Sequence, residues 1–346
     1  MFRTHTALVL VALCIGAASC SSSSTSANTT AVVTSIAPTS IAPTSIAPTP
    51  TPTAAAAPIT TAPVTTNSPG AGPVPTTSVT ATTTGAATSA TATTSAPTAT
   101  ATPKVLEVLV TNDDGYGAPG IDAIVQYLST RSDMHVSVWA PLTNQSGAGD
   151  RTTPGAAPAV TDVKTASGYP ARAVAGTPAD SVDAALNGGM AVKPDLIISG
   201  SNLGQNYGPL TSVSGTVGAA ATGARTGVHA IAISQGAPAA GGQYDFPASV
   251  TVLTGYLDAN IAAYRAGTSK VLVSINVPTC PVGVAILPTI DDLPSATAAN
   301  GRVLGAPTAC DGNPAEQVDD IDAFDAGHPV VTQIDPITLI GVVVTP

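Results

Sequence analysis

The stretch from Ser21 to Pro103 contains no Asp, Glu, Lys, Arg or His, and it sets the strongest limit on where this chain can fold. It consists mainly of Thr, Ala, Ser and Pro, and Ser-Ile-Ala-Pro-Thr occurs three times between Ser35 and Thr49. Recurrent Pro interrupts helices and central strands, and side chains this small cannot bury a core. The composition also suits O-glycosylation. We therefore expect a disordered stalk over residues 21–103 and a folded domain over residues 104–346.

The amino terminus has the pattern of an export signal. Arg3 precedes an apolar run over residues 7–18, which is too short to span a bilayer as a stable anchor. Residues 17–20, Ala-Ala-Ser-Cys, resemble a bacterial lipobox with Ala17 in place of the usual Leu. We expect a lipoprotein signal peptide over residues 1–20, so that the chain is exported and held on the outer face of the cell membrane by a lipid on Cys20. Ordinary secretion with cleavage near Cys20 is the alternative.

The remainder of the chain is strongly acidic. Lys104 is the first Lys or Arg after Arg3, so the domain carries ten basic residues against all 21 Asp and Glu of the chain. A nucleic-acid groove needs a basic stripe that displaces counterions, and this charge balance argues against one. An anionic substrate would have to be attracted by a metal ion or by backbone N–H groups.

Two cysteines, Cys280 and Cys310, lie beyond the signal segment. In an exported protein such a pair favours a disulfide, and we expect one between them. Two buried thiols are the alternative. A metal site is disfavoured because no other Cys or His is near either residue in the sequence.

Apolar runs that alternate with amphipathic segments predict the fold class. Continuous apolar runs are typical of strands buried on both faces of a parallel sheet, and they cover Val105–Val110, His135–Ala140, Asp195–Ser199, Val228–Ser234 and Lys270–Val277. Helices are expected from Pro119, over Ser214–Thr226 and over Ala248–Tyr264,. This alternation gives an α/β fold with a mainly parallel sheet covered on both faces. Ligands bind beyond the carboxyl ends of the strands in such sheets.

Asp113 and Asp114 follow the first strand, in the sequence Thr-Asn-Asp-Asp-Gly over residues 111–115. At a strand-to-loop turn both carboxylates can converge, and two carboxylates this close repel each other unless a cation lies beside them. Oxygen ligands favour Mg²⁺, Mn²⁺ or Ca²⁺ over zinc. The alternative is turn formation alone, because Asn-Asp-Asp-Gly is also a good turn sequence.

Polar residues follow the later strands as well. Residues 144–147, Asn-Gln-Ser-Gly, offer neutral oxygens after the second strand. Residues 200–206, Gly-Ser-Asn-Leu-Gly-Gln-Asn, form a loop in which Gly allows close backbone approach,. Ser214 suits a helix N-cap, and the free N–H groups at that helix start also suit an anion. Residues 177–180, Thr-Pro-Ala-Asp, fit a structural capping box,.

Together these motifs resemble the SurE family, the survival-protein 5′-nucleotidases. The blocks that carry the resemblance are Thr111–Gly115 with Ala118–Gly120, Gly176–Asp180, Ser199–Asn206, Ser214–Val217 and Ile275–Pro278, in the family's order and spacing. Agreement extends over most of Val105–Pro278, whereas residues 279–317 do not match. A Tyr commonly precedes the Ser-Gly-Thr block in the family, and Val213 stands there in this chain.

The resemblance implies a Rossmann-like three-layer sandwich with a divalent metal, Mg²⁺ or Mn²⁺, and hydrolysis of phosphate monoesters, typically nucleoside monophosphates. The family's metal ligands fall on Asp113, Asp114, Ser146 and Asn202, and its phosphate-binding residues fall on Asn206, Ser214, Gly215 and Thr216. Asp113, Asp114 and Asn206 would be the catalytic residues, with metal-activated water favoured over attack by an aspartate. The family assembles through carboxy-terminal segments, which allows a homo-oligomer, although that region departs here.

Two other functions fit parts of the sequence. A catalytically silent lipoprotein would keep the fold and capture phosphate or a nucleotide, and an adhesive surface protein would account for the stalk. The presence of both aspartates with Ser146, Asn202 and the Ser-Gly-Thr block argues against a degenerate site. We therefore expect an exported, metal-dependent phosphomonoesterase, specifically a 5′-nucleotidase, whose contact with the membrane is the Cys20 lipid.

Overall fold

The computed structural model of the protein describes residues 103–268, 271–312 and 317–342. The expected signal peptide, the stalk up to residue 102 and the lipidation site Cys20 lie outside these residues and stay predictions. Among the described residues, no helix is both long enough and apolar enough to cross a membrane.

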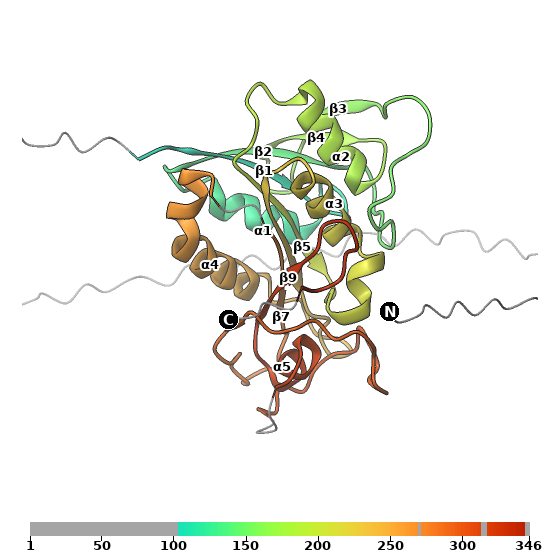
Figure 1. Ribbon diagram of the computed structural model, residues 1–346, viewed down its shortest axis with the longest axis vertical. Coiled ribbons are helices and arrows are strands. Elements are labelled where there is room, and N and C mark those ends of the chain that lie inside the picture. Colours follow the sequence, from blue (N-terminus) through green and yellow to red (C-terminus); the bar gives the residue numbers. More distant parts are fainter. Residues whose placement is uncertain (1–102, 269–270, 313–316, 343–346) are drawn as a thin grey trace, which may run out of the picture. The chain divides into compact units, whose positions relative to one another are not determined.

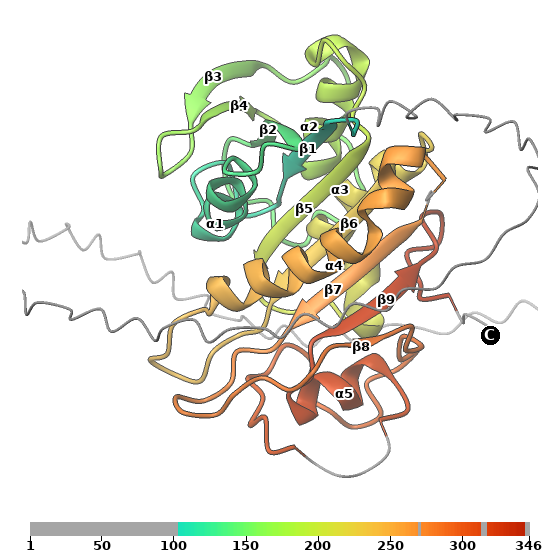
Figure 2. The same cartoon turned by 90° about the vertical axis from the view of Figure 1, so that its left-hand side faces the viewer.

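A mixed, mainly parallel sheet forms the centre of the described part (Figure 1). Its strand order is β3-β4-β2-β1-β5-β6-β7-β9-β8, which can be followed in Figure 2. Its strands are β1 (Leu106–Thr111), β2 (Met134–Pro141), β3 (Val160–Lys164), β4 (Pro170–Val174), β5 (Leu196–Leu203), β6 (His229–Gln235), β7 (Leu272–Val277), β8 (Ile290–Asp291) and β9 (Val330–Ile334). The strands from β4 across to β7 run parallel to their neighbours. The antiparallel pairs, β3 with β4 and β9 with β7, lie outside this block.

Helices cover both faces of the sheet (Figure 2). They are α1 (Pro119–Leu128), α2 (Pro178–Ala184), the π-helical turn η1 (Ala185–Gly189), the 3₁₀ turn η2 (Gly208–Val213), α3 (Gly215–Ala224), α4 (Phe246–Ala266) and α5 (Asp320–Ala326). One hydrophobic core lies between the sheet and the pair α1 and α4, with Ile124 and Leu257 fully buried. A second core lies on the face covered by α2 and α3 and contains Val182 and Val217. The predicted three-layer α/β sandwich is therefore confirmed.

The central strands are mainly apolar because neither face meets water. Every residue of β6 and β7 is buried, and in β1 only Glu107 is partly exposed. This continuous burial explains why these strands could be found from apolar runs. The capping box predicted at the start of α2 is also present, because the Thr177 hydroxyl accepts from the Asp180 N–H at 3.2 Å and the Asp180 carboxylate accepts from the Thr177 N–H at 2.8 Å.

The sequence patterns predict no helix or strand after β7. In the structure, this carboxy-terminal part forms β8, β9 and α5. Cys280 and Cys310 form a disulfide across 30 positions of sequence, which joins the segment after β7 to the segment before α5. A third, smaller core lies here, in which Ile321 and Phe324 of α5 pack around Tyr207. Tyr207 directly follows the glycine-rich loop, residues 200–206. This part of the chain therefore packs directly against the edge of the sheet where the candidate site lies.

Candidate functional site

The sheet order brings the polar residues of three loops to one edge. β1 lies between β2 and β5, so Asp113 and Asp114 after β1 are flanked by Asn144 and Ser146 after β2, and by Asn202 at the end of β5. All three strands are parallel, so these loops leave the same edge of the sheet. The Gln145 N–H also donates to the Asp113 carbonyl at 2.7 Å, which fixes the β2 loop against the aspartate turn.

Asp113 is buried, with 3% of its surface exposed. Its Oδ1 accepts from the Thr216 hydroxyl at 2.7 Å, so the first turn of α3 holds the carboxylate. Gly215 makes this close approach sterically feasible, because a Cβ there would lie 2.8 Å from the Asp113 Cβ and 2.9 Å from its Oδ2. Burial raises the pKa of Asp113 above its ordinary value, against the opposing effect of the Thr216 hydrogen bond.

Asp114 connects the two flanking loops. Its Oδ1 accepts from the Asn144 side chain at 3.1 Å, and its Oδ2 accepts from the Leu203 N–H at 3.0 Å. Burial, and then the negative charge of Asp113, raise the pKa of Asp114 to about 6. Two desolvated carboxylates side by side therefore penalise each other's negative charge, and a bound cation would relieve this penalty.

Asn112 shapes the turn that carries both aspartates, a role that sequence reasoning did not assign. Its side-chain amide donates to the Gly115 carbonyl at 2.9 Å and accepts from the Gly115 N–H at 3.2 Å. Gly115 has φ +101°, a conformation that favours glycine,. Turn formation by Asn-Asp-Asp-Gly and metal binding by the two aspartates are therefore compatible, because Asp113 and Asp114 are the two central residues of the turn that Asn112 and Gly115 close.

Asn202 is positioned by an irregularity near the end of β5. The pairing of β5 with β6 shifts register between Ser199 and Asn202. Gly200 in this shift has φ +130°, and a Cβ there would lie 2.1 Å from the Ile233 carbonyl oxygen. Irregularities of this kind re-aim side chains near active sites. The Asn202 Nδ2 donates to the Gly204 carbonyl at 2.6 Å, which leaves its Oδ1 as an oxygen donor for a ligand.

Ser146 lies on the exposed loop after β2. Its N–H donates to the Asn144 side chain at 2.9 Å, and Asn144 in turn donates to Asp114. Asn144 therefore links Ser146 to the aspartate pair. The sequence named this loop as a source of neutral oxygens but did not assign the linking role to Asn144.

Asn206 is fixed by two strands. Its side-chain amide donates to the Ser234 hydroxyl at 3.0 Å. Its backbone pairs with the Asn276 side chain, which accepts from the Asn206 N–H at 2.7 Å and donates to the Asn206 carbonyl at 3.2 Å. Asn276 was visible only as part of the Ile-Asn-Val-Pro block, and a polar residue inside a fully buried strand is the signal that could have identified it.

The start of α3 combines structural and anion-binding features. Ser214 is the N-cap, and its hydroxyl accepts from the Val217 N–H at 3.1 Å. The Thr216 hydroxyl is engaged with Asp113, so the groups that α3 offers to a phosphate are backbone N–H groups of its first turn,. Of the predicted phosphate-binding residues, Gly215 and Thr216 therefore lie beside Asp113, and the Thr216 side chain serves the carboxylate.

The donor set fits a hard divalent cation. Among the described residues, no three or more His, Cys, Asp and Glu side chains are grouped so that they could hold a metal ion. The buried Asp113 and the half-buried Asp114, with neutral amide and hydroxyl oxygens on the flanking loops, are instead the oxygen ligands that Mg²⁺ and Mn²⁺ prefer,.

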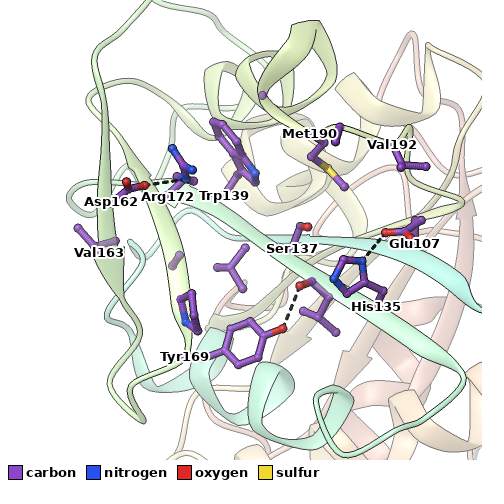
Figure 3. Close-up of a pocket in the computed structure, with 16 residues that line it drawn as sticks. Glu107, His135, Ser137, Trp139, Asp162, Val163, Tyr169, Arg172, Met190 and Val192 are labelled. Carbon is purple, nitrogen blue, oxygen red and sulfur yellow. Dashed lines mark hydrogen bonds and ion pairs between the residues drawn. The ribbon is translucent and has the colours of Figure 1, made fainter.

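A cavity of about 690 Å³ lies elsewhere, along the β2 face that carries Trp139 (Figure 3). Glu107 and His135, paired at 2.8 Å, line it near the starts of β1 and β2. Arg172 packs over the Trp139 ring at 5.7 Å and pairs with Asp162 at 2.8 Å. The side chains of the cavity are thus largely engaged with one another, and none of the predicted site residues lines it.

Three comparisons with known proteins match the same family. The family model described as survival protein SurE matches residues 108–288, about half of the chain. A 5′-nucleotidase SurE of Methanopyrus kandleri is 38% identical over 176 residues, which cover 50% of this chain and 66% of that relative, just under two thirds of its length. The crystal structure of the SurE protein from Aquifex aeolicus is similar, with a TM-score of 0.53 and 26% identity over 66% of this chain and 93% of that chain.

Proposed function

The chain belongs to the SurE family, and from this membership we propose that it hydrolyses phosphate monoesters, with nucleoside 5′-monophosphates as its substrates. The relative from Methanopyrus kandleri carries the name 5′-nucleotidase, which supports this substrate class. The observation that carries the proposal is the aspartate pair, which Thr216, Asn144 and the Leu203 N–H hold from three sides.

Asp113, Asp114, Ser146 and Asn202 would hold a divalent cation, Mg²⁺ or Mn²⁺. When bound, such an ion supplies Lewis-acid polarisation of a phosphoryl oxygen and a water of lowered pKa. The fit rests on the two adjacent carboxylates. Burial raises the pKa of both, and the charge of Asp113 also raises that of Asp114, and a bound cation would offset these effects.

The chain's own residues would bind and orient the phosphate. An amide NH₂ has two donors, so Asn206 can donate to a phosphoryl oxygen while it donates to Ser234. The N–H groups of Gly215 and Thr216 lie at the start of α3, where backbone donors and the helix dipole favour an anion,. Such preorganised donors stabilise the charge that develops on the phosphoryl oxygens. The Thr216–Asp113 hydrogen bond fixes the start of α3, the proposed anion site, relative to Asp113, one of the proposed metal ligands.

The test is phosphate release from AMP and p-nitrophenyl phosphate by the purified protein, in EDTA, Mg²⁺ or Mn²⁺. Asp114→Asn keeps the shape of the side chain but removes its charge. We expect turnover only with metal, a loss of kcat/KM on the order of 10³-fold or more in Asp114→Asn, and no rise in Tm on adding Mg²⁺ to this variant. Asp162→Asn, which changes an exposed acid that pairs with Arg172, is the matched control and should retain both responses.

The rival function is capture of a nucleotide without turnover. A folded protein that binds AMP but releases no phosphate with any metal would support that function and contradict the phosphatase. A folded protein that neither binds AMP nor turns it over would leave the adhesive role as the better account of the chain.

Export and lipid anchoring at Cys20 are a further part of the proposal. The support is the short apolar run followed by Ala-Ala-Ser-Cys at residues 17–20. Labelled palmitate should be incorporated into the full chain in a bacterial host and not into Cys20→Ala. Incorporation that is unchanged in Cys20→Ala would contradict a lipid on this cysteine.

A further inference from the structure

Two stacked aromatic rings lie between β6 and α4. The rings of Tyr244 and Phe246 are 5.7 Å apart between centroids and inclined by only 13°. Phe246 is the first residue of α4 and is buried, whereas Tyr244 is half-buried. Asp245 between them caps α4 by accepting from the Ala248 N–H at 3.3 Å. The helix start therefore fixes the two rings as a unit.

This aromatic pair lies against the loops that carry the aspartates and Asn202. A Cβ on Gly120 would lie 2.9 Å from the Phe246 ring and 1.9 Å from the Ser201 carbonyl oxygen, so all three groups meet at one point. Gly120 stands five residues after Gly115, and Ser201 directly precedes Asn202. The pKa of Tyr244 is raised by burial and by the negative charge of Asp114, which agrees with a hydroxyl on the aspartate side of the pair.

Other tyrosines near this edge are less suited to contact a ligand. Tyr207, directly after the glycine-rich loop, is 1% exposed and packs edge-on against Phe324. Tyr116 packs against the core beneath α1 and α4. Tyr244 is instead half-buried and stacked on the buried Phe246 ring, and an aromatic ring supported in this way is suited to stack on a planar aromatic group.

We propose that Tyr244 is a specificity-determining residue, whose ring stacks on the base of a nucleoside 5′-monophosphate while the phosphate lies at Asp113, Asp114 and the start of α3. This inference rests on the proposed phosphomonoesterase function and adds a preference for substrates whose leaving alcohol, the nucleoside, carries an aromatic base. Stacking tolerates any base because every base has a π-face. The enzyme should therefore favour nucleotides over sugar phosphates and discriminate weakly between purine and pyrimidine nucleotides.

The test compares AMP with ribose 5-phosphate, which has the same phosphate and sugar but no base. We expect Tyr244→Ala to raise KM for AMP on the order of tenfold or more, while KM for ribose 5-phosphate changes less than about twofold. Tyr244→Phe keeps the ring and should keep the KM of the wild type for AMP. Tyr127→Ala, a half-buried tyrosine on α1, is the control for general loss of packing.

Equal losses on AMP and ribose 5-phosphate in Tyr244→Ala would overturn the proposal, because the ring would then only support the fold or the metal ligands. An unchanged KM for AMP would overturn it as well. If the wild type releases phosphate from neither compound, the proposed function fails, and calorimetry decides on the ring separately. AMP binding that weakens in Tyr244→Ala, and not in Tyr244→Phe, would then support stacking, and equal affinities in all three proteins would contradict it.

Discussion

At the scale of single residues, Asn276 is the positioning group with the clearest consequence. Its amide bridges the N–H and the carbonyl of Asn206 at 2.7 and 3.2 Å, from a strand in which every residue is buried. Asn276→Ala removes both bonds and should let Asn206 shift. A misplacement of about 1 Å costs on the order of 100-fold in rate, so we expect kcat for AMP to fall about 10- to 100-fold.

Ser274→Ala is the matched control for Asn276→Ala. Ser274 contacts the same carbonyl of Asn206, but at 3.4 Å, and lies on the same strand. We expect its kcat to fall less than tenfold, and the Mg²⁺-induced rise in Tm to persist in both variants because the aspartates are untouched. Wild-type kcat in Asn276→Ala would contradict the positioning role.

At the scale of elements, the contact between the first turn of α3 and Asp113 can be tested by substitution of Gly215. Gly215→Ala places a methyl group 2.8–2.9 Å from the Asp113 side chain, so the carboxylate or the helix must move. We expect kcat/KM to fall on the order of 100-fold and the Mg²⁺-induced rise in Tm to shrink.

Gly255→Ala, in α4, is the contrasting variant. It has nothing within 4 Å of the new Cβ, so we expect it to raise the free energy of unfolding by about 1 kcal/mol through helix propensity. Its kcat/KM should stay that of the wild type. If Gly215→Ala behaves like Gly255→Ala, the Asp113–Thr216 contact does not organise the site.

The elements that the sequence predicts are those with burial on both faces or a clear cap. β1, β5, β6 and β7 are apolar runs, and α1 and α2 begin at Pro119 and Pro178 with recognisable starts. β3 is exposed along most of its length, so its residues show no pattern that separates a strand from a loop. α5 has only seven residues, of which three are Asp and one is Phe, and so short a segment shows no clear helical pattern. It packs into the third core through contacts with residues distant in the sequence.

The placement of the loops that carry Asp113, Asp114, Ser146 and Asn202 at one edge could be predicted, because parallel strands end at the same edge of a sheet. That these four residues bind a metal comes from the family resemblance and stays a prediction. The bonds that orient them join positions 89 and 103 residues apart, Leu203 to Asp114 and Thr216 to Asp113. No local pattern encodes such pairs, because they depend on the final placement of α3 and of the irregular end of β5.

At the scale of the whole described molecule, the carboxy-terminal part holds the glycine-rich loop from outside the sheet. The Ala306 carbonyl accepts from the Gln205 side chain at 2.7 Å, and the Asp320 carboxylate accepts from the Gly208 N–H at 2.9 Å. Tyr207 packs against Phe324. The residues on both sides of Asn206 are thus held by the chain after β7. Gln205 is held by Ala306, which lies in the segment 279–317 that does not match the family, and Tyr207 and Gly208 are held by α5.

The Cys280–Cys310 disulfide should therefore affect both stability and turnover. Closing a loop across 30 positions lowers the entropy of the unfolded chain by an amount worth about 3–4 kcal/mol. We expect the double variant Cys280→Ser, Cys310→Ser to lose about this much free energy of unfolding in urea titrations. At a temperature well below its Tm, kcat should also fall, while the Mg²⁺-induced rise in Tm persists because Asp113 and Asp114 are held by other elements.

Gln205→Ala separates the two effects of the disulfide. It breaks the contact with Ala306 and the bond that Gln205 accepts from the Ala237 N–H while the disulfide stays intact. We therefore expect kcat to fall with a loss of about 1–3 kcal/mol of stability, less than that of the cysteine double variant. If the disulfide acts on turnover through this contact, adding Gln205→Ala to the cysteine double variant should lower kcat no further, because both changes remove the same interaction. Fully multiplicative losses of kcat would instead mean that the disulfide acts on the loop by another route, such as the hydrogen bond between Asp320 and the Gly208 N–H.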